Sequence, residues 1–299
     1  MQPPSIEVSR NVRTVRAHYD SLFDVVDRAK SYEAAGFDQK PPIVNMGFWT
    51  RGAKTAREAQ EQLVRELVSR SPDVRGKRVL DAGCGLGGPA MLLASEYGAL
   101  VEGINIVERQ VRWSRRFIHG NGQEDRIRVH VASAMDVPFR NAWFDIVFCL
   151  EAAHCFVDKP RFLRECYRTL RPGGTLLLAD ITGTTHLPLV NWQPALGLNL
   201  ITGADWEKLL AAAGFEIREK TSIGKAVYPG CRRWSAKTAP ERRNMIFAKS
   251  CSATSHRAVR TLMKLRAAIL EFVYFRSVLR TLSALNLRDF VLFAAVKRG

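Results

Sequence analysis

Short apolar runs rich in β-branched and aromatic residues alternate along this chain with longer stretches that have helical spacing. Five of the runs predict strands and lie at 78–81, 100–106, 127–131, 144–150 and 175–181. Between them, apolar residues recur every three or four positions, as at Phe162, Cys166 and Leu170. Because strands and helices alternate, the pattern predicts a parallel sheet with helices on both faces.

Glycine and proline mark the ends of the predicted helices. These helices are expected over 88–98, 107–118, 159–170 and 203–213. The tetrapeptide Arg171-Pro172-Gly173-Gly174 is expected to end the third helix and turn the chain into the next strand. Two further apolar runs, at 215–222 and 289–297, predict a hairpin-like pair that closes the sheet.

Before residue 78 the pattern is mostly helical. Helices are expected over 9–22 and 56–69, and aromatic residues cluster between them at Phe48 and Trp49. We predict three parts, namely an N-terminal helical cap over 1–77, a core over 78–184, and a C-terminal part over 185–299 with a substrate-covering insertion and the final strand.

The composition is that of an ordinary globular protein, with 46% apolar and 25% charged residues. No apolar run reaches the roughly 20 residues that span a bilayer, and the first ten residues lack the pattern of a secretory signal. We therefore expect a cytoplasmic protein without a transmembrane helix. The six cysteines lack paired CxxC spacing, so no metal site is predicted.

The net charge of +16 leaves several partners open. An anionic acceptor, an anionic membrane surface and nucleic acid would each be attracted by it. The arginines are dispersed, however, as in the groups 10–16, 112–116 and 257–280. A solvated basic face without a partner is therefore the simplest alternative.

The sharpest local signal is a glycine-rich turn between an apolar strand and a helix. Gly83, Gly85 and Gly87 follow the first strand and allow the backbone to pass close to a ligand. Asp81 stands two residues before the first glycine, where it suits a ligand that carries an ammonium group. A pyrophosphate would be repelled there, although Gly83, Gly85 and Gly88 also satisfy the GxGxxG pattern of dinucleotide-binding proteins.

The order of elements, from this glycine turn through Asp145 to the Arg-Pro-Gly-Gly turn and the last two strands, resembles the class I S-adenosylmethionine-dependent methyltransferases. The resemblance covers about 78–181 and the final strand. It implies a doubly wound, seven-stranded Rossmann-like sheet with an antiparallel last strand and an N-terminal helical lid. The implied cofactor is S-adenosyl-L-methionine.

Within that superfamily, residues 103–110 resemble the small-molecule group, which includes sterol, tocopherol, cyclopropane-fatty-acid and natural-product tailoring methyltransferases. The resemblance implies a natural-product, isoprenoid or lipid-like acceptor, methylated on carbon, nitrogen or oxygen. It also assigns the ribose hydroxyls to Asn105 and Gln110, although Asn105 could instead cap a helix. The adenine is assigned to Ser133, which replaces a usual aspartate, and to the amide of Ala134; Leu150 also belongs to the cofactor site.

The segment after the fourth strand, 150–156, is where this group places residues that face the transferred methyl. His154 is the candidate base, and Asp180 could orient it or the substrate, or cap a helix. Glu151 is assigned to the substrate. Three lid aromatics could cover the sulfonium by cation–π contact, or could simply be core residues: Tyr19, Phe48 and Trp49.

Three other functions stay open from the sequence. A nucleic-acid methyltransferase is disfavoured, because no Asn/Asp-Pro-Pro-aromatic run follows the fourth strand and no base-recognition module is evident. A nicotinamide-dependent oxidoreductase would account for the GxGxxG pattern. The third is a ligand-binding protein that keeps the cofactor pocket without activity.

Overall fold

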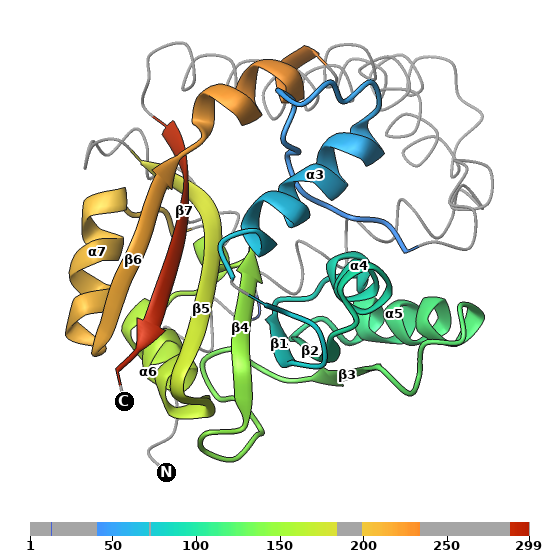
Figure 1. Cartoon of the computed structure of the whole chain (residues 1–299), viewed down its shortest axis with the longest axis horizontal. Coiled ribbons are helices and arrows are strands. Elements are labelled where there is room, and N and C mark those ends of the chain that lie inside the picture. Colours follow the sequence, from blue (N-terminus) through green and yellow to red (C-terminus); the bar gives the residue numbers. More distant parts are fainter. Residues whose placement is uncertain (1–12, 14–40, 72, 184–198, 234–287, 299) are drawn as a thin grey trace, which may run out of the picture.

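The computed structural model describes residues 13, 41–71, 73–183, 199–233 and 288–298. Its centre is a seven-stranded sheet of order β3-β2-β1-β4-β5-β7-β6 (Figure 1). The strands are β1 Arg78–Ala82, β2 Leu100–Asn105, β3 Ile127–Val131, β4 Phe144–Leu150, β5 Leu170–Gly183, β6 Phe215–Ser222 and β7 Arg288–Lys297. All neighbours pair in parallel except β7, which is antiparallel to β5 and β6. The predicted sheet with an antiparallel last strand is confirmed.

One detail of the sheet differs from the prediction. The Arg-Pro-Gly-Gly tetrapeptide lies inside β5 as a bulge: Phe144 pairs with Leu170 and Ile146 with Thr175, so four residues of β5 stand opposite Asp145. Arg171 is held there by an ion pair to Asp145 at 2.7 Å. The last two strands are antiparallel neighbours, as predicted for the hairpin-like pair; β7 lies between β5 and β6, and residues 223–287 connect the two strands.

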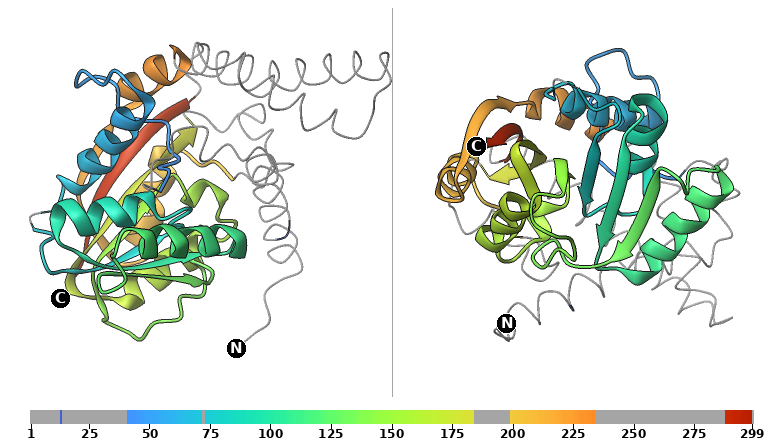
Figure 2. Two further views of the ribbon diagram at one scale, coloured as in Figure 1. Left: turned by 90° about the vertical axis from the view of Figure 1, so that its right-hand side faces the viewer. Right: turned by 60° about the horizontal axis from the view of Figure 1, so that its bottom comes forward.

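Helices cover both faces of the sheet (Figures 1 and 2). They are α3 Ala56–Val68, α4 Gly88–Tyr97, α5 Glu108–Gly120, α6 Lys159–Thr169 and α7 Gly203–Ala212, with one 3-10 turn, η1, at Ala153–Cys155. The apolar side chains of α3, α4 and α5 form one core cluster, and those of α6 and α7 form the other. Each helix expected after residue 55 is present, whereas the one expected at 9–22 lies outside the described residues.

One helix, at 224–233, was not predicted. It lies beside α3 in every view and appears orange in Figures 1 and 2. Val227 and Tyr228 are buried in the same cluster as the apolar face of α3. Its sequence has small and basic residues around a short apolar face, so the hydrophobic periodicity of this segment is too weak to predict a helix.

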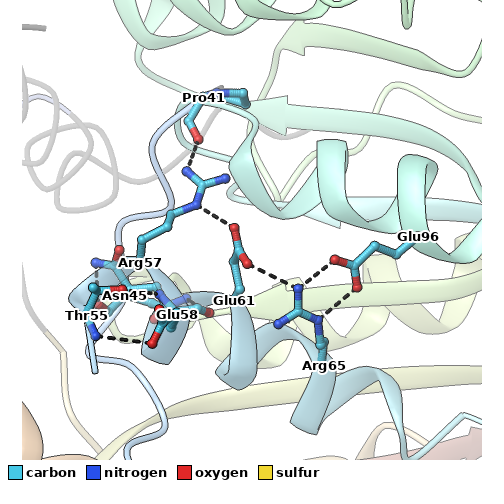
Figure 3. Close-up of polar contacts among 9 residues, drawn as sticks. Pro41, Asn45, Thr55, Arg57, Glu58, Glu61, Arg65 and Glu96 are labelled. Carbon is cyan, nitrogen blue, oxygen red and sulfur yellow. Dashed lines mark hydrogen bonds and ion pairs between the residues drawn. The ribbon is translucent and has the colours of Figure 1, made fainter. Parts of the chain in front are cut away.

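The residues that precede α3 run across the carboxyl edge of the sheet, and we call residues 41–49 the N-terminal strap. Arg57 of α3 donates to the carbonyl of Pro41 at 2.7 Å, and Gln60 exchanges two hydrogen bonds of 3.1 Å with Asn45 (Figure 3). At the other end of the strap, the Phe48 N–H donates to the carbonyl of Ala59 at 2.8 Å. The strap is therefore fixed to α3 along its length.

An ion-pair chain also links α3 to α4. It runs from Arg57 through Glu61 and Arg65 to Glu96, with N–O distances of 2.6, 3.1 and 2.6 Å (Figure 3). Partly exposed pairs contribute only about 0.2–1 kcal/mol each. The fully buried Leu63 contributes about 1.5–3 kcal/mol by itself, so apolar packing holds α3 in place. None of the described helices is long and apolar enough to cross a membrane.

Candidate active site

The loop between β1 and α4 holds three glycines in backbone conformations that other residues rarely adopt. Gly83, Gly85 and Gly87 have φ of +90°, +54° and +83°. A Cβ on Gly83 would overlap Ala152, and one on Gly87 would overlap Ser114, so packing also requires these two glycines. At Gly85, no atom of the described residues lies within 4 Å of such a Cβ. The loop is therefore open at Gly85, where a ligand can approach the backbone.

Asp81 lies in β1 just before this loop and is 2% exposed. Its Oδ2 atom has no hydrogen-bond partner among the described residues. Burial raises the pKa of Asp81 to about 7, because the charged carboxylate loses its water. A buried carboxyl oxygen without a partner is unfavourable, so the position suits a ligand that brings a cation or a donor. The amino-acid ammonium group of S-adenosylmethionine fits this requirement.

Asn105 and Gln110, which end β2 and begin α5, lie side by side. The Asn105 Nδ2 donates to the Gln110 Oε1 at 2.5 Å and to the carbonyl of Gly85 at 3.4 Å. The Asn105 Oδ1 accepts from the Val107 N–H at 3.1 Å and so closes a local turn before α5, whose N-cap residue is Val107. The two amides therefore lie side by side near the glycine loop, and the alternative of a helix-capping Asn105 is wrong because α5 has no side-chain cap. Their contact with a ribose stays a prediction.

Residues 132–136 follow β3, the strand that neighbours β2 in the sheet. The Ser133 hydroxyl accepts from the Met135 N–H at 3.1 Å and forms a local turn, and its second lone pair and its proton leave further bonding capacity. The Ala132 N–H donates to the carbonyl of Asn105 at 3.1 Å, which joins this segment to β2. Ala134, in the turn that follows β3, and Leu150, the last residue of β4, are buried. Their proposed adenine and donor contacts, and that of Ser133, stay predictions.

His154 and Asp180 form a buried pair at the carboxyl ends of β4 and β5. The His154 Nδ1 lies 2.6 Å from the Asp180 Oδ1, and the His154 backbone N–H donates to Oδ2 at 2.6 Å. Asp180 also accepts from the Ile181 N–H at 2.8 Å. Because three groups converge on one carboxylate, the imidazole has a fixed orientation, with Nε2 turned away from Asp180.

The pair changes the protonation of the imidazole. Burial alone would lower the pKa of His154, but the neighbouring Cys155 and the Asp180 carboxylate raise it well above its usual value. A raised pKa favours the protonated imidazole. A base at this position becomes available only as the pH rises.

Glu151 directly follows β4 and has a left-handed φ of +47°. Its Oε1 accepts from the Met46 N–H at 2.7 Å, so it holds the N-terminal strap over the end of β4. Loss of water raises the pKa of Glu151 to about 8, although the bond from Met46 acts in the opposite direction. Such backbone strain in a residue other than glycine often marks functional sites. Contact between Glu151 and the acceptor stays a prediction.

The lid aromatics are packed side chains in this structure. Phe48 is buried in the core cluster of α3, and Arg51 lies over its ring at 5.7 Å. The Trp49 indole donates to the carbonyl of Met46 at 2.8 Å, and its ring packs on Gly230. Both match the alternative of core aromatics, and any role in covering the acceptor stays a prediction. Tyr19 lies outside the described residues.

Two further residues at this edge have no clear signal in the sequence. The buried Lys159 ammonium donates to the carbonyl of Asn199 at 2.5 Å, and the Asn199 N–H donates to the carbonyl of His154 at 2.6 Å. The only available sign is a lysine directly after the helix cap Asp158, because a cation is unfavourable at a helix N-terminus. Within the described residues, no cluster of His, Cys, Asp and Glu could hold a metal ion.

Comparison with known proteins identifies the fold and the chemistry together. The methyltransferase domain family matches residues 80–178. The chain is 30% identical to the O-methyltransferase cnsE of Penicillium expansum over 200 residues, which is 65% of this chain and 72% of that protein. It is 31% identical to the methyltransferase GfsG of Streptomyces halstedii over 215 residues, 69% of this chain and 76% of that one. The chain belongs to this methyltransferase family. Its cofactor is therefore S-adenosylmethionine, as the sequence resemblance implies.

A third relative of this methyltransferase is the 27-O-demethylrifamycin SV methyltransferase of Amycolatopsis mediterranei, 37% identical over 162 residues, 54% of this chain and 56% of that protein. Solved structures share the fold at lower identity. The [4+2]-cyclase SpnF has a TM-score of 0.71 and 21% identity, covering 93% of this chain and 94% of its own. The geranyl diphosphate C-methyltransferase of Streptomyces coelicolor has a TM-score of 0.62 and 14% identity, covering 86% and 90%. The comparisons give no support to a nucleic-acid methyltransferase or a nicotinamide enzyme.

Proposed function

We propose that this methyltransferase O-methylates a hydroxyl group of a natural-product, isoprenoid or lipid-like acceptor, with His154 as the base. The observation that carries the proposal is the buried His154–Asp180 pair at the carboxyl ends of β4 and β5. A hydroxyl is a poor nucleophile until its proton leaves, so a base beside it is what O-methylation needs. The names of two relatives, which describe O-methyltransferases, support the same reaction.

The glycine-loop side of the edge would hold the cofactor. S-adenosylmethionine supplies a methyl group on a positively charged sulfur. Asp81 would accept from its ammonium group, Asn105 and Gln110 would bind the ribose hydroxyls, and Ser133 and the Ala134 amide would bind the adenine. The open side of the loop at Gly85 gives this ligand access to the backbone.

The residues at the other side would bind the acceptor and take its proton. The methyl group would leave the sulfur of the cofactor, which departs as S-adenosylhomocysteine, and bond to the acceptor oxygen, while the proton of the acceptor hydroxyl would move to the His154 Nε2. Asp180 holds Nδ1 and stabilises the resulting imidazolium. The strap, fixed by Glu151, would exclude water from this side of the site.

The proposal also covers the metabolic role of the enzyme, the charge of its acceptor and its location in the cell. A role in secondary metabolism is supported by relatives that carry natural-product names, such as the rifamycin methyltransferase. The basic surface would favour an anionic acceptor, and the geranyl diphosphate methyltransferase is a structural neighbour that takes one. A cytoplasmic location, contact with a membrane surface, the absence of a nucleic-acid partner and the division at 77 and 184 rest on the sequence alone.

The test is an untargeted methylation assay. The full chain is incubated with a metabolite extract and S-adenosylmethionine carrying a labelled methyl group, and mass spectrometry follows compounds that gain one labelled methyl. We expect a product labelled on oxygen. Label on carbon or nitrogen would contradict the proposed reaction, and tight S-adenosylhomocysteine binding without any labelled product would favour a binding protein.

A further inference from the structure

Lys159 is a buried cation that the proposed chemistry does not use. It is the first residue of α6 and is 3% exposed. Its Nζ donates to the carbonyls of Phe156 at 3.0 Å and Asn199 at 2.5 Å, and it lies 5.8 Å from the centre of the Trp206 ring. Both burial and the helix dipole disfavour a positive charge at this position. The two carbonyls and the Trp206 ring offset part of the free-energy cost of burying the charge. An apolar residue at this position would carry no such cost.

The two carbonyls lie on either side of the turn that carries His154. Phe156 directly follows η1, and Asn199 touches the turn from outside. The Asn199 N–H donates to the carbonyl of His154 at 2.6 Å, and its Nδ2 donates to the carbonyl of Val157 at 3.2 Å. Because η1 is a single turn without a side-chain cap, these external bonds fix its position.

We propose that Lys159 is a positioning residue for His154: its ammonium group ties Asn199, which donates to the carbonyl of His154, to the end of η1. The proposal rests on the proposed role of His154 as the base. It assigns Lys159 no contact with the cofactor or the acceptor.

The charges around Lys159 give the proposal a measurable consequence. Its ammonium group interacts electrostatically with Asp180 of β5, Cys155 of η1 and Cys149 of β4. Burial lowers the pKa of Lys159 to about 8, while Asp180 acts in the opposite direction. The Asp180 carboxylate therefore interacts with both Lys159 and His154. If Lys159 is removed, Asp180 attracts the proton of His154 more strongly, so the pKa of His154 should rise further.

The experiment is a histidine titration by NMR on the full chain bound to S-adenosylhomocysteine. The six histidines are labelled with ¹³C in the ring, and His154→Gln identifies the signal of His154. In Lys159→Met we expect the pKa of His154 to rise by roughly one unit. Lys159→Arg keeps the charge and should restore most of the original value. Lys208→Met, on the exposed face of α7, is the matched control and should leave the titration unchanged.

Calorimetric S-adenosylhomocysteine affinity shows that each variant is folded. Should Lys159→Met not fold, Lys159→Gln keeps a donor for the carbonyls, drops the charge and must show the same rise. A folded Lys159→Met or Lys159→Gln protein with an unmoved His154 titration overturns the proposal. If the titration moves while His154→Ala keeps full turnover, the base assignment is wrong and the coupling of Lys159 to His154 stands.

Discussion

Asp81, Glu151 and His154, at the carboxyl edge of the sheet, all have raised pKa values, which favour neutral carboxyl groups but a charged imidazole. Loss of water raises the pKa of Asp81 to about 7 and that of Glu151 to about 8, although the Met46 N–H and the nearby His154 act in the opposite direction on Glu151. His154 loses water too, but the carboxylate of Asp180 lies beside it and its pKa rises instead of falling. The edge therefore contains two carboxyl groups that a positively charged ligand would stabilise in their ionised form, and an imidazole that is already paired with a carboxylate.

The open side of the glycine loop is tested by Gly85→Asp. We expect this change to abolish S-adenosylhomocysteine binding, because a charged side chain would fill the space where the ligand meets the backbone, close to Asp81. Gly122→Asp is the matched control, since Gly122 has a similar φ of +62° and also has no described atom near its Cβ position. Calorimetry should show undiminished affinity in the control; undiminished affinity in a folded Gly85→Asp protein would contradict the cofactor site.

Glu151 should make the protein less stable as the pH rises. Its folded-state pKa of about 8 exceeds the ordinary value of 4.5, so folding takes up a proton between these values and the free energy of unfolding falls over that range. Glu151→Gln keeps an oxygen for the Met46 N–H and cannot ionise. Urea unfolding from pH 5.5 to pH 9 should therefore show a flatter pH dependence in Glu151→Gln, and parallel curves for the two proteins would contradict this assignment.

Among the elements, the strap depends on contacts far apart in the sequence. Trp49 donates its backbone N–H to the carbonyl of Ala226 at 3.0 Å, and its ring occupies the space above Gly230. Met46 meets Glu151 at the end of β4. The strap thus joins the helix at 224–233, the helix α3 and the sheet.

Gly230→Ala tests this junction. A methyl group would overlap the Trp49 ring, so we expect a loss of about 1–3 kcal/mol in the free energy of unfolding and a changed tryptophan fluorescence. Gly120→Ala, at the end of α5 with no described atom near its Cβ position, should be neutral or slightly stabilising. Equal effects of the two substitutions on urea unfolding would show that the strap is not held by this contact.

The same elements show what the sequence can predict. Periodicity locates β3 and β4 to the residue, because β3 alternates apolar and polar positions and β4 is a nearly continuous apolar run. The bulge in β5 is missed because Pro172 and Gly173 signal a break whether the chain turns or bulges. The motif positions His154 and Asp180 follow from the order of strands, whereas Lys159 and the strap contact of Glu151 depend on pairings 40 and 105 residues apart.

For the whole molecule, the net charge of +16 is the feature with a functional consequence. If the basic surface attracts an anionic acceptor, association is faster at low ionic strength, and kcat/KM should fall steeply as salt is added. A neutral acceptor should be indifferent to salt. Steady-state kinetics between low and physiological ionic strength decide this. A kcat/KM that does not change with salt would favour the alternative of a solvated basic face without a partner.

The proposed role of His154, which takes the proton of the acceptor while Asp180 holds its imidazole, is tested most directly by the turnover of His154→Ala across pH. With the acceptor found in the extract assay, we expect kcat to fall by roughly two to four orders of magnitude while S-adenosylhomocysteine affinity is kept. His119→Ala, an exposed histidine on α5, should behave like the wild type. The wild-type kcat should rise with pH along a limb above the ordinary imidazole range, because the pKa of His154 is raised. A folded His154→Ala protein with near-full kcat and the wild-type pH profile would contradict the account.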